Sequence, residues 1–522
     1  MFQKKKALPE AMHRARARRP APSARRPCPL MCAQDHRSGS RPVLFNNINA
    51  FCRNNFRSGW LGDRFNAKPG KPHMRVAIVG AGYVGLTTGA CLTLLGHHVS
   101  CHDTDPVRLG QLKRGRIPIY EPRLDDIVAQ SMGQGRLAFS DDMAGTVSNA
   151  RIVFLTVGTP SLADGDIDLS HLEEAARQLA PHLQPLTKVV IKSTVSVGTS
   201  RQIAQIIRGA RGRDDIAVAV NPEFLREGSA VDDFLNPDRI VIGSDCPDAL
   251  RALKALYQPL LERSETRLLE TGPEDAELVK HGANAFLAMK LAFINDVADL
   301  CERTGANIDA VAQGIGLDER IGPHFLRAGP GFGGSCFPKD TRAFAAAGRR
   351  TGARQTLVED VARNNDRRKE AMARRILSQG ELAPGDTVAI LGVAFKGETD
   401  DVRESPALTV IPLLQAYGCR IRAHDPRAMG TAGALLGNVQ WCRDAVTAAE
   451  GANALVILTD WQEFLDVDFG RIASAMTGRA VFDMRNMLDP EAVAAHGLDC
   501  FGIGRPAVRA PRLLTRTLRK AG

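Results

Sequence analysis

The sequence lacks the cysteine and histidine spacings that hold zinc or build a disulfide framework. Its 11 cysteines are scattered through 522 residues, without a CxxC pair and without a His/Cys cluster. Disulfide-dependent proteins belong to oxidising compartments, and this pattern points to none. We therefore expect unpaired thiols, no metal site and a cytoplasmic location.

A long hydrophobic run is also missing. Residues 1–73 contain no apolar stretch of signal-peptide length, and the one long weakly polar stretch, residues 76–96, is interrupted by glycines. We expect no membrane insertion. With 44% hydrophobic and 24% charged residues, the composition is typical of a soluble protein. The length allows two or three domains.

The net charge of +10 belongs to one end of the chain. Residues 1–73 contain 16 Lys and Arg but 3 Asp and Glu, which leaves 52 basic against 55 acidic residues from Met74 onward. With this balance the globular part is not expected to bind nucleic acid.

The basic extension, residues 1–73, allows three interpretations. Its composition is typical of an organellar transit peptide or of a nucleic-acid-binding arm, and it is equally explained as upstream sequence attached to a protein that begins at Met74. In each case its few apolar residues do not offset the entropy of ordering, so we expect disorder. Residues 506–522 form a second, short basic tail.

A dinucleotide-binding fingerprint follows the first strand-like run, residues 76–79. In GAGYVG at 80–85, Gly80 is predicted to make a tight turn, Gly82 to let a pyrophosphate approach a helix N-terminus, and Gly85 to allow close packing of helix on strand. Asp103 ends the next strand-like run, where an acid binds an adenosine ribose and favours NAD over NADP. The motif predicts an NAD site.

Strand-like and helix-like segments continue to alternate beyond this fingerprint. Apolar runs at 152–157 and 189–195 lead to Thr159 and to Ser193 and Thr194. Because ligands of doubly wound sheets lie at the carboxyl ends of strands, these side chains are predicted to face a cofactor or substrate. Ordinary turn chemistry would select the same residue types.

A long helix is predicted from Pro273 to about Arg303, with acids in its first turn. At 1.5 Å per residue it would measure about 45 Å, enough to bridge two domains. Lys280 and Asn284 lie four residues apart and share one face. They are candidate site residues, although an exposed surface lysine is the common alternative.

A second α/β unit begins after residues 384–386, and its first strand-like run leads into a loop with Lys396 and Arg403. These charges suit a nucleotide diphosphate, although a solvated charged loop is the alternative. The expected fold class is α/β, with two Rossmann-like doubly wound domains joined by a long central helix. The strand-like runs of this second unit are residues 388–393, 420–423, 454–458 and 480–482.

The segment GFGGSCFPKD at 331–340 presents one cysteine between a glycine-rich approach and a Lys-Asp pair. Glycines allow unusual backbone conformations and the close approach of a ligand. Lys339 is predicted to favour the Cys336 thiolate and Asp340 to handle protons, as for a covalent nucleophile. The alternative is a buried structural cysteine.

Eight motifs, all in family order, give the region from Met74 to about Arg505 a specific resemblance to the UDP-glucose/GDP-mannose dehydrogenase family. The resemblance implies an NAD-binding domain (74–272), a central helical dimerisation region with the cysteine loop (273–375) and a UDP-sugar-binding domain (384–505). The motifs are GAGYVG (80–85), VGTP (157–160), KSTV (192–195), NPEFLREG (221–228), NPDRIVIG (236–243), KHGANAF (280–286), GFGGSCFPKD (331–340) and FKGETDDVRES (395–405).

The resemblance also implies an activity. A nucleotide-sugar alcohol, UDP-glucose, would be oxidised by four electrons to UDP-glucuronate, consuming two NAD and one water through a Cys336 thiohemiacetal and thioester. GDP-mannose and a UDP-N-acetylhexosamine are alternative substrates of the same chemistry. The protein would act as a homodimer or higher homo-oligomer, without metal.

By the same resemblance, individual residues receive roles. The catalytic residues are Cys336, Asp340, Lys280, Asn284, Thr159 and Glu223. The cofactor contacts are Gly80, Gly82, Tyr83, Val84, Gly85, Asp103, Arg108, Thr159, Thr194, Glu227, Lys339 and Arg403. The substrate contacts are Glu223, Phe224, Leu225, Glu227, Lys280, Asn284, Phe325, Phe332, Gly333, Phe395, Lys396, Arg485 and, from a partner subunit, Arg320. Met484 departs from the family, which usually has glycine there.

Two rival functions remain open. A one-step hydroxyacid-type dehydrogenase would share the first domain and a helix-borne lysine, but it has no use for Cys336. An NAD- or nucleotide-sensing binding module would use the basic extension to reach nucleic acid, and its binding would be sensitive to salt and lost on removal of residues 1–73.

Overall fold

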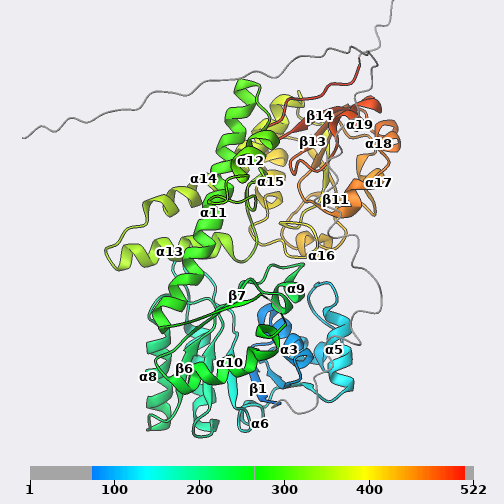
Figure 1. Cartoon of the computed structure of the whole chain (residues 1–522). Coiled ribbons are helices and arrows are strands. Elements are labelled where there is room, and N and C mark those ends of the chain that lie inside the picture. Colours follow the sequence, from blue (N-terminus) through cyan, green and yellow to red (C-terminus); the bar gives the residue numbers. More distant parts are fainter. Residues whose placement is uncertain (1–72, 264, 512–522) are drawn as a thin grey trace, which may run out of the picture. The chain divides into compact units, whose positions relative to one another are not determined.

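The computed structural model describes residues 73–263 and 265–511 (Figure 1). Residues 1–72 of the predicted extension and 512–522 of the predicted tail lie outside the described residues, so the predictions about them stay predictions.

The first sheet has eight strands in the order β3-β2-β1-β4-β5-β6-β7-β8, and all its neighbouring strands are parallel except β6 and β7. Its strands are β1 (Arg75–Val79), β2 (His98–His102), β3 (Leu137–Ser140), β4 (Ile152–Leu155), β5 (Lys188–Ile191), β6 (Ala217–Val220), β7 (Arg239–Gly243) and β8 (Arg267–Thr271). Its helices are α3 (Tyr83–Leu94), α4 (Pro106–Leu112), α5 (Leu124–Gly133), α6 (Met143–Val147), α7 (Ser170–Leu179), η1 (Ala180–His182), α8 (Thr199–Arg211), α9 (Ala230–Leu235) and α10 (Pro247–Leu261).

The centre of this sheet is apolar because its strands are covered on both faces. Every residue of β4 and β5 is buried, and ten of the twelve residues of α3 are buried as well. The first six strands follow the 3-2-1-4-5-6 order of a Rossmann fold, whose order reverses between β1 and β4. In such folds the ligand lies at the carboxyl ends of the strands that flank this reversal.

The second sheet repeats the arrangement with six parallel strands in the order β11-β10-β9-β12-β13-β14. Its strands are β9 (Thr387–Leu391), β10 (Arg420–His424), β11 (Val439–Trp441), β12 (Ala454–Ile457), β13 (Ala480–Asp483) and β14 (Asp499–Gly502). Its helices are α15 (Ala407–Tyr417), α16 (Met429–Gly433), α17 (Ala445–Ala449), η2 (Gln462–Leu465), α18 (Phe469–Ala475) and α19 (Pro490–Ala495).

The two sheets share details beyond strand order. A glycine with positive φ follows the first strand of each, Gly80 at +102° and Gly392 at +87°. The next backbone N–H donates to the carboxylate that follows the second strand, Asp103 in one sheet and Asp425 in the other, at 2.7 Å in both cases. The two sheets therefore have the same turn after the first strand and the same hydrogen bond to the carboxylate after the second strand.

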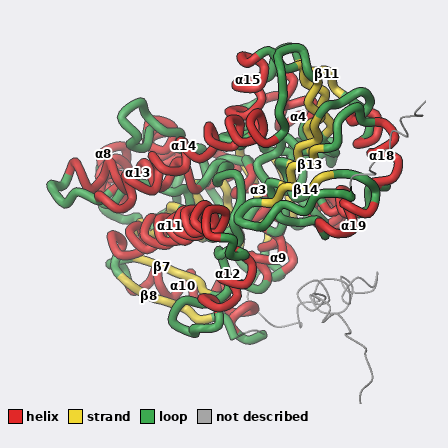
Figure 2. The backbone as a smooth tube through the Cα atoms, turned by 90° about the horizontal axis from the view of Figure 1, so that it is seen from above, coloured by secondary structure: helices red, strands yellow, loops and turns green. Residues whose placement is uncertain are grey.

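Helix α11 (Pro273–Thr304) connects the sheets. Pro273 begins it and Gly305, with φ of +77°, ends it, as expected for a helix start and stop. The helix contacts β6 and β7, while Ile294 and Ala298 belong to the core of the second sheet. Figure 2 shows α11 beside α13 (Phe337–Arg350) and α14 (Thr356–Gln379), and these three helices contact one another. Helix α12 (Ile308–Gly316) follows α11.

The predicted fold class is confirmed. The predicted helix from Pro273 corresponds to α11, and the predicted runs of the second unit correspond to β9, β10, β12 and β13. Six strands were not predicted, namely β3, β6, β7, β8, β11 and β14, and of these β7 and β14 are mostly buried. Among the helices of residues 73–263 and 265–511, none combines the length and the apolar character of a membrane-crossing segment.

Candidate active site

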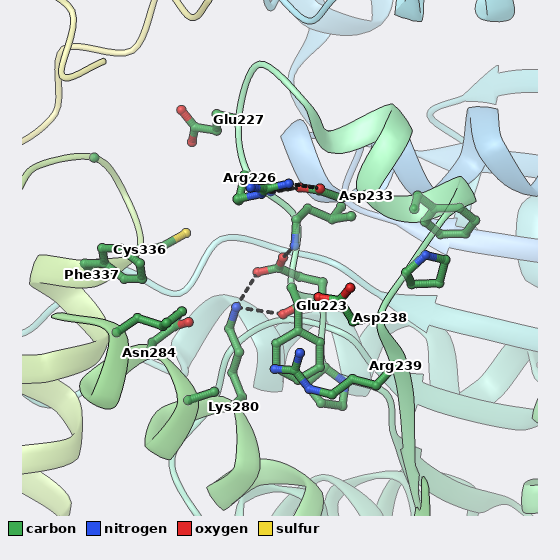
Figure 3. A pocket seen from close by; sticks show the side chains of 18 of the residues that line it. Glu223, Arg226, Glu227, Asp233, Asp238, Arg239, Lys280, Asn284, Cys336 and Phe337 are labelled. Carbon is green, nitrogen blue, oxygen red and sulfur yellow. Dashed lines mark hydrogen bonds and ion pairs between the residues drawn. The ribbon is translucent and has the colours of Figure 1, made fainter. Parts of the chain in front are cut away.

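One cavity of about 900 Å³ collects most of the predicted catalytic residues (Figure 3). Its walls come from the segment after β6, from α11, from the loop before α13 and from the loop after β9. The volume suits a small-molecule ligand. The predicted site residues that line it are Glu223, Phe224, Leu225, Glu227, Lys280, Asn284, Phe325, Gly333, Cys336, Phe395 and Lys396.

Cys336 occupies the N-cap position of α13, at the end of the glycine-rich loop. A Cβ on Gly333 would lie 2.4 Å from the Glu404 carbonyl oxygen, and one on Gly334 would lie 2.8 Å from the Phe395 ring. Both positions therefore require glycine. The glycines were predicted to admit a ligand, and here they admit the loop that follows β9.

The Cys336 thiol is held in its neutral form. Burial raises its pKa to about 11, with a further contribution from the negative charge of Glu223, and the Lys280 ammonium opposes both only in part. The prediction that Lys339 favours the thiolate differs from the structure, because its Nζ lies 2.6 Å from Asp340 Oδ1 instead. At neutral pH this thiol would need a base to become a thiolate.

Lys280 and Glu223 form a buried ion pair on the cavity wall. Lys280 Nζ donates to Glu223 Oε1 at 2.9 Å and to the Glu223 carbonyl oxygen at 2.7 Å, and the two side chains are 4% and 6% exposed. Burial disfavours the charged lysine, but Glu223, Cys336 and Asp340 together outweigh it, so the pKa of Lys280 is raised. The pair presents a fixed cation to the cavity.

Asp340 lies behind Asn284 and not on the cavity wall. Its fully buried carboxylate accepts from Asn284 Nδ2 and from Lys339 Nζ, both at 2.6 Å. Burial raises the pKa of Asp340, but the Lys339 and Lys280 ammonium groups outweigh that effect and lower it. An ionised Asp340 therefore orients the Asn284 amide towards the cavity.

Glu227 lines the same cavity as Cys336 and comes from a different loop. Its carboxylate accepts from Ser335 Oγ at 2.9 Å and from Thr399 Oγ1 at 3.3 Å, and Arg403 Nη2 lies 3.4 Å away. Burial, together with the negative charge of Asp401, raises the pKa of Glu227 to about 7.

The glycine-rich turn after β1, residues 80–85, forms a cradle at the start of α3 that fits a dinucleotide. A Cβ on Gly82 at the start of α3 would meet no atom within 4 Å, whereas one on Gly85 would lie 1.9 Å from the Gly80 carbonyl oxygen. Room for a phosphate therefore exists at a helix start that no side chain caps. Arg108 Nη1 donates to both oxygens of Asp103 at 2.9 Å, beside the position predicted for a ribose.

Two further cofactor candidates adjoin this cradle. Val84 follows Tyr83 in the first turn of α3. The Tyr83 hydroxyl donates to Glu121 and accepts from the Gly228 N–H at 3.1 Å, which ties α3 to the loop that carries Glu227.

Several predicted residues lie outside the cavity lining, and their roles stay predictions. Thr159 Oγ1 donates to the Thr194 carbonyl oxygen at 2.8 Å. Phe332 packs in a small apolar cluster with Ala288. Arg485, next to the buried Met484, donates to the carbonyl oxygens of Leu458 and Phe395. The Arg320 side chain is 89% exposed and pairs with Asp318.

The cavity also contains groups that were not predicted. Asn221 Oδ1 accepts from Lys192 Nζ at 3.1 Å and from the Tyr257 hydroxyl at 2.6 Å, and the Arg239 guanidinium lies 3.9 Å from the centre of the Phe224 ring. Burial lowers the pKa of Lys192 to about 8. The sequence feature that could have identified these groups is the position of Lys192 directly after β5 and of Asn221 directly after β6.

Family models match most of the described chain. The NAD binding domain of the UDP-glucose/GDP-mannose dehydrogenase family matches residues 74–261, its central domain residues 274–367 and its UDP binding domain residues 389–490.

Known proteins align over the same region. The chain is 47% identical over 437 residues to UDP-glucose 6-dehydrogenase of Rhizobium meliloti, covering 83% of this chain and 100% of that protein. A UDP-glucose dehydrogenase structure from Pyrobaculum islandicum matches with a TM-score of 0.78 and 36% identity, over 84% of this chain and 100% of that one. A UDP-D-ManNAc dehydrogenase structure from Pyrococcus horikoshii matches with a TM-score of 0.72 and 29% identity, over 83% and 99%.

Proposed function

The chain belongs to the UDP-glucose/GDP-mannose dehydrogenase family, and from that premise we propose that it oxidises UDP-glucose to UDP-glucuronate with NAD. The observation that carries the proposal is the placement of the Cys336 thiol in one cavity with the Lys280–Glu223 pair and the Asn284 amide. A dehydrogenase that stops at the aldehyde has no need of that thiol.

The α3 cradle is proposed to hold the cofactor. The α3 N-terminus would bind the pyrophosphate, and Asp103 with Arg108 would bind the ribose. When bound, NAD⁺ accepts the hydride in each oxidation. The remaining proposed contacts are those given above, namely Tyr83, Val84, Thr159, Thr194, Glu227, Lys339 and Arg403.

Cys336 is proposed to keep the aldehyde on the enzyme. Its sulfur adds to the aldehyde carbon to form a thiohemiacetal, whose oxidation gives a thioester. The Lys280 ammonium and the Asn284 amide, oriented by Asp340, stabilise the negative charge on the substrate oxygen. Glu223 then activates the water that cleaves the thioester.

The nucleotide part of the substrate is proposed to lie against the loop that contains Phe325 and Gly333. Phe395 and Lys396 border the same cavity from the second sheet. Phe332 and Arg485 point elsewhere in this chain, so their contribution would require movement of their loops.

A homodimer is proposed from one face of α11. Four large apolar side chains spaced seven or eight residues apart are exposed there, and a second copy of the helix would cover them. In such a dimer the exposed Arg320 would reach the cavity of the partner subunit, as the family resemblance implies. The exposed side chains are Leu278, Phe286, Phe293 and Leu300.

Domain limits and location are part of the proposal. We assign residues 74–272 to the NAD-binding domain, 273–375 to the dimerisation region and 384–505 to the UDP-sugar domain. All eight cysteines of the described residues are unpaired, which supports the cytoplasm as the location.

The test is the ratio of NADH formed to sugar consumed with limiting UDP-glucose and excess NAD⁺. A ratio of about two is expected from two hydride transfers. A ratio of about one would contradict covalent capture, because the aldehyde would then escape. No NADH with UDP-glucose, but formation with GDP-mannose or a UDP-N-acetylhexosamine, would reassign the substrate.

A further inference from the structure

We propose that Ser335 relays the proton of the Cys336 thiol to the Glu227 carboxylate, making Glu227 the base that activates the nucleophile. The inference rests on the proposed function for its purpose. Its geometry and its test need neither sugar nor cofactor.

The three groups form a continuous line of hydrogen bonds. Cys336 Sγ lies 3.5 Å from Ser335 Oγ, which donates to Glu227 Oε1 at 2.9 Å. A serine hydroxyl has one proton to donate, and here that proton is committed to Glu227. The hydroxyl therefore accepts from the thiol, which sets the direction of transfer from sulfur to carboxylate.

Among the described residues, the hydrogen bonds of the other two acids near the thiol do not lead to its sulfur. Glu223 accepts from Lys280 and from the Leu225 N–H, and Asp340 accepts from Asn284 and Lys339. The raised pKa of Lys280 and the lowered pKa of Asp340 keep both of these groups ionised. In the view of Figure 3 the Cys336 sulfur lies between Glu227 and Lys280. Glu227 is the acid connected to the sulfur through a hydroxyl.

The proton affinity of Glu227 suits the task. Burial and the nearby Asp401 raise its pKa to about 7, so the carboxylate is available to take a proton at neutral pH. Charged and titratable groups that act on it are Asp401, Arg403, Tyr83 and Lys396, and those that act on Cys336 are Glu223, Lys280, Asp340 and Arg403.

The step balances without an external reagent. The thiol proton moves to Ser335 Oγ as the Ser335 proton moves to Glu227, and the sulfur electron pair forms the bond to the aldehyde carbon. The carbonyl π pair moves to oxygen, which takes a proton from the Lys280 ammonium. Nothing is oxidised or reduced in this step.

The test is the rate at which iodoacetamide alkylates Cys336 in the full chain, measured from pH 6 to pH 10 by mass spectrometry of the Cys336 peptide. In the unaltered protein the rate should rise through the Glu227 pKa near pH 7 and then level off. Without the relay it should instead climb steadily towards the thiol pKa of about 11.

Variants assign the effect to the relay. Ser335→Ala and Glu227→Gln should each lose the plateau and react at least about tenfold more slowly at pH 8. Ser335→Thr keeps the hydroxyl and should restore the plateau. Ser378→Ala, an exposed serine on α14, should leave the profile unchanged.

Two results would overturn the proposal. One is an unchanged pH profile in both Ser335→Ala and Glu227→Gln. The other is equal loss in Ser335→Ala and Ser335→Thr with a normal profile in Glu227→Gln, which would make Ser335 a packing residue only. Neither result changes the NADH-to-sugar ratio of the unaltered protein, so failure of the relay and failure of the proposed function remain distinguishable.

Discussion

Two thiols of this chain, the buried Cys101 and the partly buried Cys336, face different surroundings although both are neutral. Burial raises the pKa of Cys336 to about 11 and that of Cys101 to about 12. Cys101 lies in β2 within the apolar core of the first sheet, whereas Cys336 lines the cavity beside Lys280. Reactivity therefore depends on access and on a nearby proton acceptor more than on burial.

Replacing each thiol separates these roles. Cys336→Ala should lower complete oxidation of UDP-glucose by about a thousandfold or more, because the aldehyde is no longer captured. Cys101→Ala should change the turnover rate little. NADH formation and the sugar product are measured for both, and equal losses would contradict a special role for Cys336.

The protonation of Glu227 affects stability as well as chemistry. A carboxyl whose pKa is higher in the folded protein than in the unfolded chain disfavours folding increasingly as the pH rises from its unfolded value of about 4.3 to its folded value. That folded value is about 7 here. Glu227→Gln should therefore gain at least about 1 kcal/mol of stability relative to the unaltered protein between pH 5 and pH 8.

The measurement is the urea unfolding midpoint of both proteins at the two pH values. Glu370→Gln, which alters an exposed acid on α14, is the matched control and should show no such gain. A Glu227→Gln difference that is the same at pH 5 and pH 8 would contradict the raised pKa.

At the scale of single residues, the site residues that lie in local sequence motifs could be predicted. The motifs located Cys336, Lys280 and Asn284, which line one cavity. They did not predict that Lys339 pairs with Asp340, nor that Asn221 joins Lys192 to Tyr257. These partners are chosen by packing between distant segments, and no spacing in the sequence expresses that choice.

At the scale of elements, glycines decide how closely two segments approach. Gly82 begins α3 beside open space, while Gly85 one turn later lies against the Gly80 backbone. The two glycines of the motif are therefore needed for different reasons: Gly82 leaves room for a ligand, and Gly85 allows close packing.

Alanine substitutions distinguish the ligand-binding role of Gly82 from the packing role of Gly85. Gly82→Ala should leave the melting temperature unchanged and weaken NAD binding at least about tenfold, because the new methyl group occupies the phosphate approach. Gly85→Ala should destabilise the fold by more than about 2 kcal/mol, since backbone atoms meet the new group.

Calorimetric titration with NAD and thermal unfolding provide the two measurements. Gly209→Ala on α8 is the control, because its Cβ meets no atom within 4 Å and the site is exposed and lies outside the cradle. Normal NAD affinity in Gly82→Ala would contradict the assignment of the cradle.

The strands that were predicted from the sequence followed burial only in part, because the mostly buried β7 and β14 were not predicted. The central strands β1, β4 and β9 are apolar runs and were predicted from the sequence. Strand β11 has three residues, none fully buried, and β8 has no buried residue at all. Edge strands of this kind lack the continuous apolar pattern that identifies a strand, so only the neighbouring strand defines them.

At the scale of the whole molecule, the matched region and the cavity both lie beyond residue 73. A chain that begins at Met74 should therefore keep its turnover rate and melting temperature. Both are measured beside the full chain, together with DNA and RNA binding at low and high salt. Salt-sensitive binding that is lost on truncation would favour the binding-module interpretation of the basic extension.

Association of two copies should complete each active site. Arg320 is exposed and pairs with Asp318, whereas the face with Phe293 and Leu300 offers apolar surface for a second α11. If Arg320 serves the partner's cavity, a mixed dimer with Arg320→Ala on one subunit and Cys336→Ala on the other has both changes in the same active site. The mixed dimer then has one site with both groups intact.

Mixing the two inactive variants under exchange conditions should recover about a quarter of the unaltered activity, because half of the dimers are mixed and each has one complete site. Phe293→Asp should lower the dimer fraction in light scattering and reduce activity with it, while Leu186→Asp, at an exposed position between η1 and β5, should do neither. Recovery of no activity on mixing, with exchange verified, would show that Arg320 does not act across the dimer.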